Sequence, residues 1–110
     1  MITRNELCRH ATALIAAIAP LWAATANAEP NAQTLYNAYC IACHGAEMNA
    51  GIGGSLVDAE WKYAKTDAEI VALIQKGIPE KGMVSFEKIL SEKQINDLVK
   101  LIRSKALSSE

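Results

Sequence analysis

The sequence has few residues that bind metal ions through nitrogen or sulfur. Its 110 residues include two histidines and three cysteines. A structural zinc site needs four such ligands. Cys8 and His10 lie in an N-terminal segment that we expect to be removed, which leaves Cys40, Cys43 and His44. Three ligands are too few, so the rest of the chain is not predicted to hold a structural zinc ion.

The sequence also lacks an excess of charge of either sign. The formal net charge is −1, from 11 basic and 12 acidic residues. Loss of the N-terminal segment removes Arg4, Arg9 and Glu6, which leaves nine basic and eleven acidic residues. Binding to nucleic acid or to an anionic membrane surface would favour a basic excess. We therefore expect neither as a partner.

A long apolar run is missing as well. The stretch Ala11–Ala24 is apolar, but it is shorter than a membrane-spanning helix and contains Pro20. Two arginines precede it, and the small-residue sequence Ala26-Asn27-Ala28 follows it. This order is typical of an export signal. We predict that residues 1–28 are a cleaved signal peptide; the alternative is an uncleaved helix at a membrane interface.

Residues 29–110 would then form a single small domain. A domain of this size has a marginal hydrophobic core and usually needs a covalent or metal-based staple. No strand pattern and no internal repeat is visible in this part of the sequence, whereas three segments have helical spacing. We therefore predict an all-α fold.

The most informative motif is Cys40-Ile41-Ala42-Cys43-His44, a C-x-x-C-H run. On a helix, residues spaced by three and four share one face, so two thiols and one imidazole can meet a single flat ligand. This arrangement suits covalent haem attachment, with thioethers at both cysteines and His44 on the iron. A redox dithiol pair would need a βαβ context, which the surrounding sequence does not have.

On these residues the chain resembles a small class I c-type cytochrome over residues 31 to 105. The resemblance implies about three main helices wrapped around one haem c, which would also be the staple of the small core. Such haem is attached by a bacterial pathway that acts outside the inner membrane. The motif and the predicted export signal therefore agree on a periplasmic location.

The expected helices can be placed from their capping signals and apolar spacing. One should begin near Asn31 and continue through the haem motif to about Gly45, followed by a glycine-rich loop at residues 51–56. A second should begin at the capping box of Thr66 and Glu69 and stop at Gly77. The last should begin after Ser91 and have one apolar face, formed by Ile95, Leu98, Val99 and Ile102.

Elimination reduces the number of residues that could be the sixth ligand of the iron. His44 is the only histidine after residue 28, which leaves a methionine, a lysine or an open position. Met48 is one helical turn from His44 and so lies on the same side of the haem. Met83 lies in a loop farther along the chain, and its placement resembles that of the ligand methionine of class I cytochromes. Val84 follows it where family members usually have proline, so we expect a more mobile loop.

The resemblance also implies contacts around the haem. A backbone carbonyl near Gly54 would accept a hydrogen bond from the second ring nitrogen of His44. Trp61 and Tyr63 would each direct a polar group at a haem propionate, although ordinary half-buried aromatic residues fit the pattern too. A docking patch near the haem edge, or a plain solvated surface, is formed by Lys62, Lys65, Lys81 and Lys88.

Together these features predict a periplasmic monohaem electron carrier, monomeric and without enzymatic activity. Its partners would be a dehydrogenase as electron donor, with similarity to cytochromes that serve quinoprotein dehydrogenases, and a terminal oxidase or another cytochrome as acceptor. Two alternatives remain open. An open sixth position would give a haem-based gas sensor or weak peroxidase, and a stable association would make the chain a fixed cytochrome subunit of a larger enzyme.

Overall fold

The computed structural model of the chain describes residues 15–20 and 27–108. Much of the predicted signal peptide, including Arg4, Cys8 and Arg9, lies outside the described residues. The secondary structure of the described residues is helical, apart from one isolated antiparallel bridge between Ile78 and Met83. The prediction of an all-α fold is confirmed.

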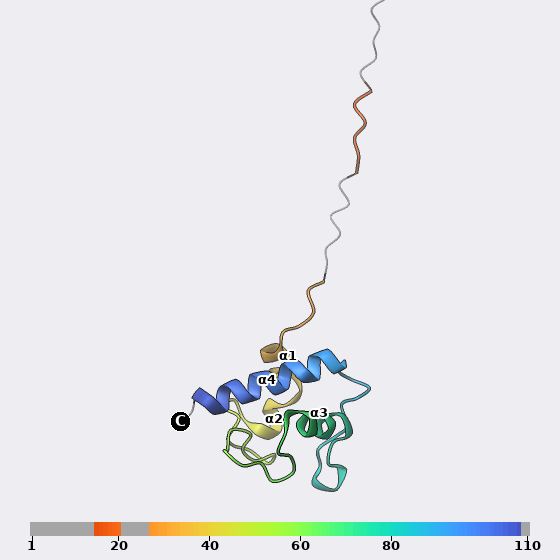
Figure 1. The fold of residues 1–110 in the computed structure, drawn as a ribbon. Helices are drawn as coiled ribbons and strands as arrows, with labels where there is room; N and C mark the ends of the chain where they lie inside the picture. Colours follow the sequence, from red (N-terminus) through yellow and green to blue (C-terminus); the bar gives the residue numbers. More distant parts are fainter. Residues whose placement is uncertain (1–14, 21–26, 109–110) are drawn as a thin grey trace, which may run out of the picture.

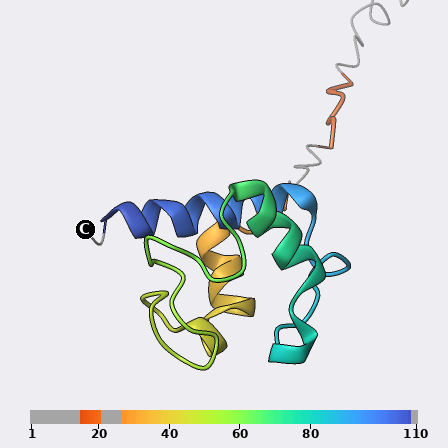
Figure 2. The same cartoon turned by 60° about the horizontal axis from the view of Figure 1, so that its bottom comes forward.

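Four α-helices and one short 3₁₀ helix follow one another along the chain. They are α1 (Ala32–Tyr39), α2 (Ile41–His44), α3 (Asp67–Lys76), η1 (Pro79–Lys81) and α4 (Glu92–Ser108). Helix α4 packs against both α1 and α3 and so joins the two halves of the domain (Figure 1). In Figure 2, α2 and the loop that contains η1 both lie on the same side of α4. No described helix is both long and apolar enough to cross a membrane.

The predicted first helix is divided into α1 and α2. Asn31 caps α1 by accepting a hydrogen bond from the backbone N–H of Thr34 at 2.9 Å. The interruption falls at Cys40, whose φ of −116° departs from helical values. Helical hydrogen bonds continue on both sides of it, because Cys40 N–H donates to Tyr36 and His44 N–H donates to Cys40. The haem motif therefore begins at a local irregularity between two helical segments.

The two later helices begin where their capping signals predicted. Thr66 and Glu69 form a reciprocal capping box at the start of α3, and Gly77 ends that helix. The same exchange occurs before α4, where Ser91 N–H donates to Gln94 Oε1 at 2.9 Å and Gln94 N–H donates to Ser91 Oγ at 3.2 Å. Local hydrogen bonds thus fix both helix starts.

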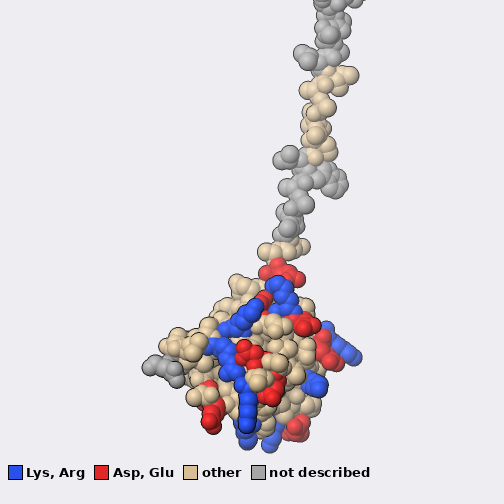
Figure 3. All heavy atoms as spheres, in the orientation of Figure 1, with Lys and Arg blue, Asp and Glu red and all other residues tan. Residues whose placement is uncertain are grey.

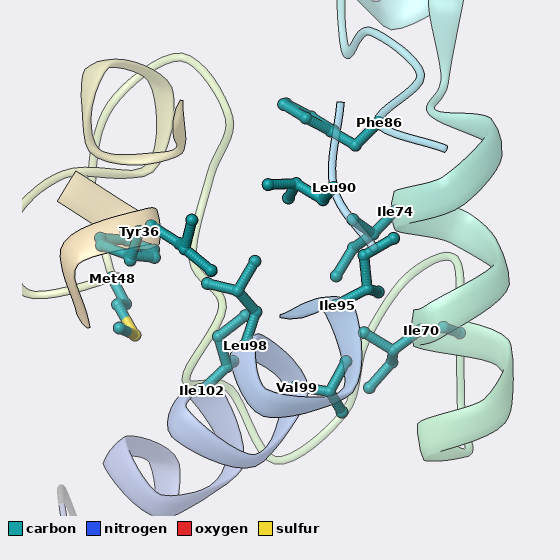
Figure 4. Close-up of a cluster of buried hydrophobic side chains, with 12 residues drawn as sticks. Tyr36, Met48, Ile70, Ile74, Phe86, Leu90, Ile95, Leu98, Val99 and Ile102 are labelled. Atoms are coloured by element: carbon teal, nitrogen blue, oxygen red, sulfur yellow. The ribbon is translucent and has the colours of Figure 1, made fainter. Parts of the chain in front are cut away.

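The hydrophobic core lies between α4, α1 and α3 (Figure 4). The four predicted residues of α4 are all buried, as are Ile70 and Ile74 of α3. Phe86 and Leu90, which both follow Met83 in the sequence, complete the core on its α3 side. The buried hydrophobic residues are Leu35, Tyr36, Met48, Ala64, Ile70, Ile74, Phe86, Leu90, Ile95, Leu98, Val99 and Ile102.

Candidate functional site: the haem motif and the Met83 loop

The haem motif places two free thiols and one imidazole within a single turn of the chain. The Cys43 side chain is exposed and the Cys40 side chain is half-buried. Burial raises the pKa of the Cys40 thiol to about 11, with a smaller effect from the neighbouring Cys43. In the bare polypeptide Cys40 is therefore a neutral thiol at pH 7.

The imidazole of His44 is fixed by a carbonyl of the glycine-rich loop. Its Nδ1 lies 3.1 Å from the carbonyl oxygen of Gly54, the residue that the family resemblance indicated. A carbonyl oxygen only accepts hydrogen bonds, so Nδ1 must carry the proton. This tautomer leaves the lone pair of Nε2 available to bind a metal.

Gly53 permits the glycine-rich loop to pass close against the Cε1–Nδ1 edge of the histidine ring. A Cβ atom at this position would lie 2.6 Å from Cε1 and 2.7 Å from Nδ1 of His44. Gly53 N–H also donates to the carbonyl of Cys43 at 2.6 Å. The loop is thus packed against the motif, and only glycine leaves room for the imidazole.

Tyr36 forms a second tie around the motif, which the sequence did not predict. Its side chain is fully buried, and its hydroxyl donates to the carbonyl of Gly45 at 2.7 Å. Burial, with a smaller effect from Cys40, raises the pKa of Tyr36 to about 12, so the hydroxyl stays a donor at neutral pH. The bond joins the chain before the motif to the chain after it. A tyrosine at an apolar helix position was the only available signal, and it indicated packing alone.

The Met83 loop is a tight hairpin closed by main-chain hydrogen bonds. Ile78 N–H donates to Met83 at 2.9 Å, and Met83 N–H donates back to Ile78 at 3.1 Å. Gly82 completes the turn with a φ of +84°. The side chain of Met83 is half-buried and packs against the edge of the core. Met48, in contrast, is 2% exposed and belongs to the core itself.

The end of α3 holds this hairpin through further contacts. Ser85 Oγ donates to the carbonyl of Gln75 at 2.6 Å. Phe86 N–H lies 3.2 Å from the carbonyl oxygens of both Ile74 and Gln75. A Cβ atom on Gly77 would lie 2.5 Å from the Met83 carbonyl, so the two backbones are in close contact. These ties hold the loop although Val84 stands where family members usually have proline.

An aromatic contact brings the haem motif and the Met83 loop together. Tyr39 immediately precedes Cys40, and its ring meets the ring of Phe86 edge to face with centroids 6.2 Å apart. Phe86 follows Met83 by three residues. Two segments that are distant in the sequence therefore border the same region of the domain.

Trp61 and Tyr63 differ sharply in their surroundings. Trp61 Nε1 is buried and has no hydrogen-bond partner, whereas the other buried side-chain nitrogen and oxygen atoms of the described residues have one. The guanidinium carbon of Arg103 lies 5.3 Å from the centroid of its ring. The Tyr63 side chain is 51% exposed, and the Lys62 ammonium lies 5.3 Å from its ring. Trp61 thus has a fixed ring and an unused donor, whereas Tyr63 lies at the surface.

The four lysines of the predicted docking patch are exposed. On the face drawn in Figure 3, basic and acidic side chains alternate and no area of a single sign stands out. Several charges are already paired, including Lys105 with Glu47 at 2.6 Å and Arg103 with Asp67 at 2.8 Å.

The residues present fit a haem. Nε2 of His44 and the thioether of Met83 supply one nitrogen and one sulfur donor, and Trp61 Nε1 supplies an unused hydrogen-bond donor for a carboxylate. Large apolar or aromatic side chains in the same segments are exposed, which suits packing against an apolar macrocycle. They are Tyr39, Ile52, Tyr63, Val84 and Ile89.

Comparison with known proteins gives the same assignment. The family model described as cytochrome C oxidase, cbb3-type, subunit III matches residues 27–102. The solved structure of the KustC0563 c-type cytochrome is 28% identical, with a TM-score of 0.60 over 69% of this chain and 98% of that one. A mutant of the same cytochrome is 27% identical, with a TM-score of 0.60 over 69% of this chain and 99% of that one. The search of curated proteins gave no significant match.

The family match covers the haem motif, the glycine-rich loop, the Met83 hairpin and most of α4. The helical fold and the oriented His44 ring agree with it. The chain therefore belongs to the family of cytochrome C oxidase, cbb3-type, subunit III, and is a small c-type cytochrome that carries covalently bound haem c.

Proposed function

We propose that this protein is a periplasmic monohaem electron carrier whose iron cycles between the ferrous and ferric states. The observation that carries the proposal is the pairing of two potential axial ligands on fixed segments. His44 is oriented by the Gly54 carbonyl. The segment after Met83 contacts the end of α1, directly before the haem motif, through Phe86 and Tyr39. Electron transfer is fast when both ligands stay bound in both redox states, because little reorganisation is then needed.

Each residue of the site has a separate role in this proposal. Cys40 and Cys43 hold the haem through thioethers, and His44 binds the iron through Nε2. Met83 would be the second protein ligand to the iron, and its soft thioether would favour ferrous iron and raise the reduction potential. The bound haem supplies the redox chemistry, while the chain supplies the ligands and limits the access of water.

Trp61 is the stronger of the two proposed propionate donors. A buried indole N–H without a partner costs about 1–3 kcal/mol, and a propionate oxygen would remove that cost. Tyr63 is exposed, so its hydroxyl would reach a propionate only at the rim of the site. We assign the inner contact to Trp61 and the outer one to Tyr63.

The role of a carrier, rather than of an enzyme, follows from the proposed ligand set. With His44 and Met83 both bound to the iron, no position would be left for a substrate. After residue 28 His44 is the only histidine, and it is used on the iron, so a histidine to act on bound peroxide is lacking. An open sixth position would restore the alternatives of a gas sensor or a weak peroxidase.

The redox partners we propose are a periplasmic dehydrogenase, such as a quinoprotein enzyme, as donor and a terminal oxidase or another cytochrome as acceptor. The family description names an oxidase subunit, and this favours a second candidate function, a fixed cytochrome subunit of a larger enzyme. The two differ in behaviour on purification. A free carrier elutes as a monomer, and a fixed subunit co-purifies with its partner.

The direct test is to express the full chain in bacteria that mature c-type cytochromes, and to fractionate the cells. We expect periplasmic protein that begins at Glu29, carries one haem resistant to acid-acetone extraction, and excludes carbon monoxide from its ferrous iron. Haem-free protein from a competent periplasm would contradict the carrier proposal. Rapid binding of carbon monoxide by the ferrous wild type would support the sensor or peroxidase instead.

A further inference from the structure

Trp61 lies at a junction of three parts of the domain. It precedes α3, borders a pocket lined by residues 61–65 and Glu69, and meets Arg103 of α4. Its indole nitrogen is buried and unpartnered within the described part of the chain. The direction of this donor depends on what fixes the plane of the ring.

Arg103, in the C-terminal half of α4, provides that constraint. Its guanidinium carbon stands 5.3 Å from the indole centroid, within the range of a cation–π contact. The Nε group donates to Asp67 Oδ1 at 2.8 Å, and Nη2 donates to the carbonyl of Lys65 at 3.4 Å. The guanidinium is thus held at the start of α3 while it lies over the tryptophan ring.

We propose that Arg103 is a positioning residue for the haem, acting through Trp61. By fixing the indole ring, Arg103 keeps Nε1 directed at a haem propionate and so maintains a hydrogen bond to that carboxylate. This inference rests on the proposed contact between Trp61 and the propionate. It adds a residue of α4, distant from both axial ligands in the sequence, that controls the haem environment.

The expected direction of the effect follows from electrostatics. A hydrogen bond to the propionate disperses its negative charge, and a negative charge near the iron favours the ferric state. Loosening the indole weakens this bond and therefore lowers the reduction potential. A lysine in place of Arg103 keeps the charge, but it lacks the branched group that can lie over the ring while it donates to both Asp67 and Lys65.

The experiment compares Arg103→Met with a matched control, Lys105→Met, in the full-length holoprotein. Both changes remove one cation from the C-terminal half of α4, and each leaves one carboxylate without its partner, Asp67 or Glu47. The measurements are the reduction potential and the hydrogen exchange rate of the Trp61 indole N–H in the diamagnetic ferrous protein. The Trp61 signal is assigned by its loss in Trp61→Phe.

We expect Arg103→Met to lower the potential and to speed indole exchange severalfold, with Arg103→Lys between it and the wild type. Lys105→Met should leave the exchange rate unchanged and move the potential less. In the Trp61→Phe background, Arg103→Met should lower the potential no more than Lys105→Met does.

If Trp61→Phe lowers the potential but Arg103→Met matches Lys105→Met in both measurements, the role of Arg103 is wrong and the propionate contact stands. If Trp61→Phe leaves the potential unchanged, the propionate contact itself is wrong, and the role of Arg103 fails with it.

Discussion

The two segments that supply the proposed axial ligands are held in different ways. On the His44 side, the ligand ring itself donates a hydrogen bond from Nδ1 to the Gly54 carbonyl, and the Tyr36 hydroxyl donates to the Gly45 carbonyl beyond the motif. On the Met83 side, every hydrogen bond of the hairpin is made by the backbone or by Ser85. The thioether of Met83 has no strong hydrogen-bonding group of its own.

This contrast indicates which of the two proposed ligands is held less firmly by the chain. The His44 ring is held by its own hydrogen bond and by a packed glycine loop. The proposed thioethers at Cys40 and Cys43 would add two covalent attachments next to it. Met83 is positioned only as well as its backbone is, through contacts with the end of α3. Changes on the His44 side should therefore reduce the stability of the fold, whereas changes on the Met83 side should alter the properties of the iron while the domain stays folded.

The largest effect should come from Gly53→Ala. The new Cβ would lie 2.6 Å from His44 Cε1 and 2.9 Å from the Cys43 carbonyl, so the loop must move away from the motif. We expect the free energy of unfolding to fall by about 2–4 kcal/mol. Urea unfolding of the holoprotein measures this change in stability.

Gly82→Ala is the control for Gly53→Ala, because open space surrounds Gly82 and only its left-handed φ of +84° costs about 1–2 kcal/mol. Equal losses in both variants would show that the loop is not packed on His44.

The next effect should come from Tyr36→Phe, which removes the hydroxyl that donates to Gly45 at 2.7 Å. The carbonyl loses a buried partner, so we expect a loss of about 1–2 kcal/mol in the free energy of unfolding. Tyr63→Phe, at an exposed tyrosine, should change stability little. A Tyr36→Phe variant as stable as the wild type would mean that the hydroxyl does not hold the motif.

A smaller loss of stability, with a spectroscopic signature, should follow Ser85→Ala. The variant loses the 2.6 Å hydrogen bond to Gln75, worth about 0.5–1.5 kcal/mol, and the hairpin becomes freer to move. We expect a weaker far-red sulfur-to-iron band in the ferric protein and slow entry of carbon monoxide in the ferrous protein. Ser104→Ala removes a similar bond, to Leu101 at 2.7 Å, and should leave both unchanged. An unaltered band in Ser85→Ala would mean that this tie does not position Met83.

The smallest effect concerns the pair of Glu47 and Lys105, which joins the segment after the motif to α4. The hydrogen bond from Lys105, and then its charge, lowers the pKa of Glu47 below its ordinary value of 4.5. Because the folded-state pKa is the lower one, the stabilisation is present above pH 4.5 and is lost as the pH falls through the folded-state value. Glu47→Gln should therefore be slightly less stable than the wild type at pH 7 and equal to it in acid. A difference that persists in acid, or that Glu80→Gln reproduces, would rule out this ion pair as its source.

Local sequence signals predicted more of this molecule than long-range ones did. The capping pairs Thr66 with Glu69 and Ser91 with Gln94 are three residues apart, so spacing alone reveals them. The bond between Ser85 and Gln75 and the contact of Arg103 with Asp67 join residues 10 and 36 positions apart. No periodicity encodes such pairs, since they depend on how α3 and α4 pack.

The features of the site also fall into those that the sequence predicted and those that it did not. The C-x-x-C-H spacing carries its own chemistry, and the family resemblance located the Gly54 carbonyl. The interruption at Cys40 was not predicted, because the helical spacing continues through it. Trp61 and Tyr63 looked equivalent in the sequence, and only packing against Arg103 and solvent exposure separate them.

The most direct test of the central claim is the spectrum of Met83→Ala beside that of Met48→Ala. Both variants lose a thioether, but Met48 is a core residue and Met83 is the proposed ligand. We predict that Met83→Ala keeps its covalent haem, loses the far-red sulfur-to-iron band, has a lower reduction potential and binds carbon monoxide when reduced. Met48→Ala should lose stability, but it should keep the far-red band, the reduction potential and the exclusion of carbon monoxide seen in the wild type. A Met83→Ala protein that retains the band and still excludes carbon monoxide would contradict the account.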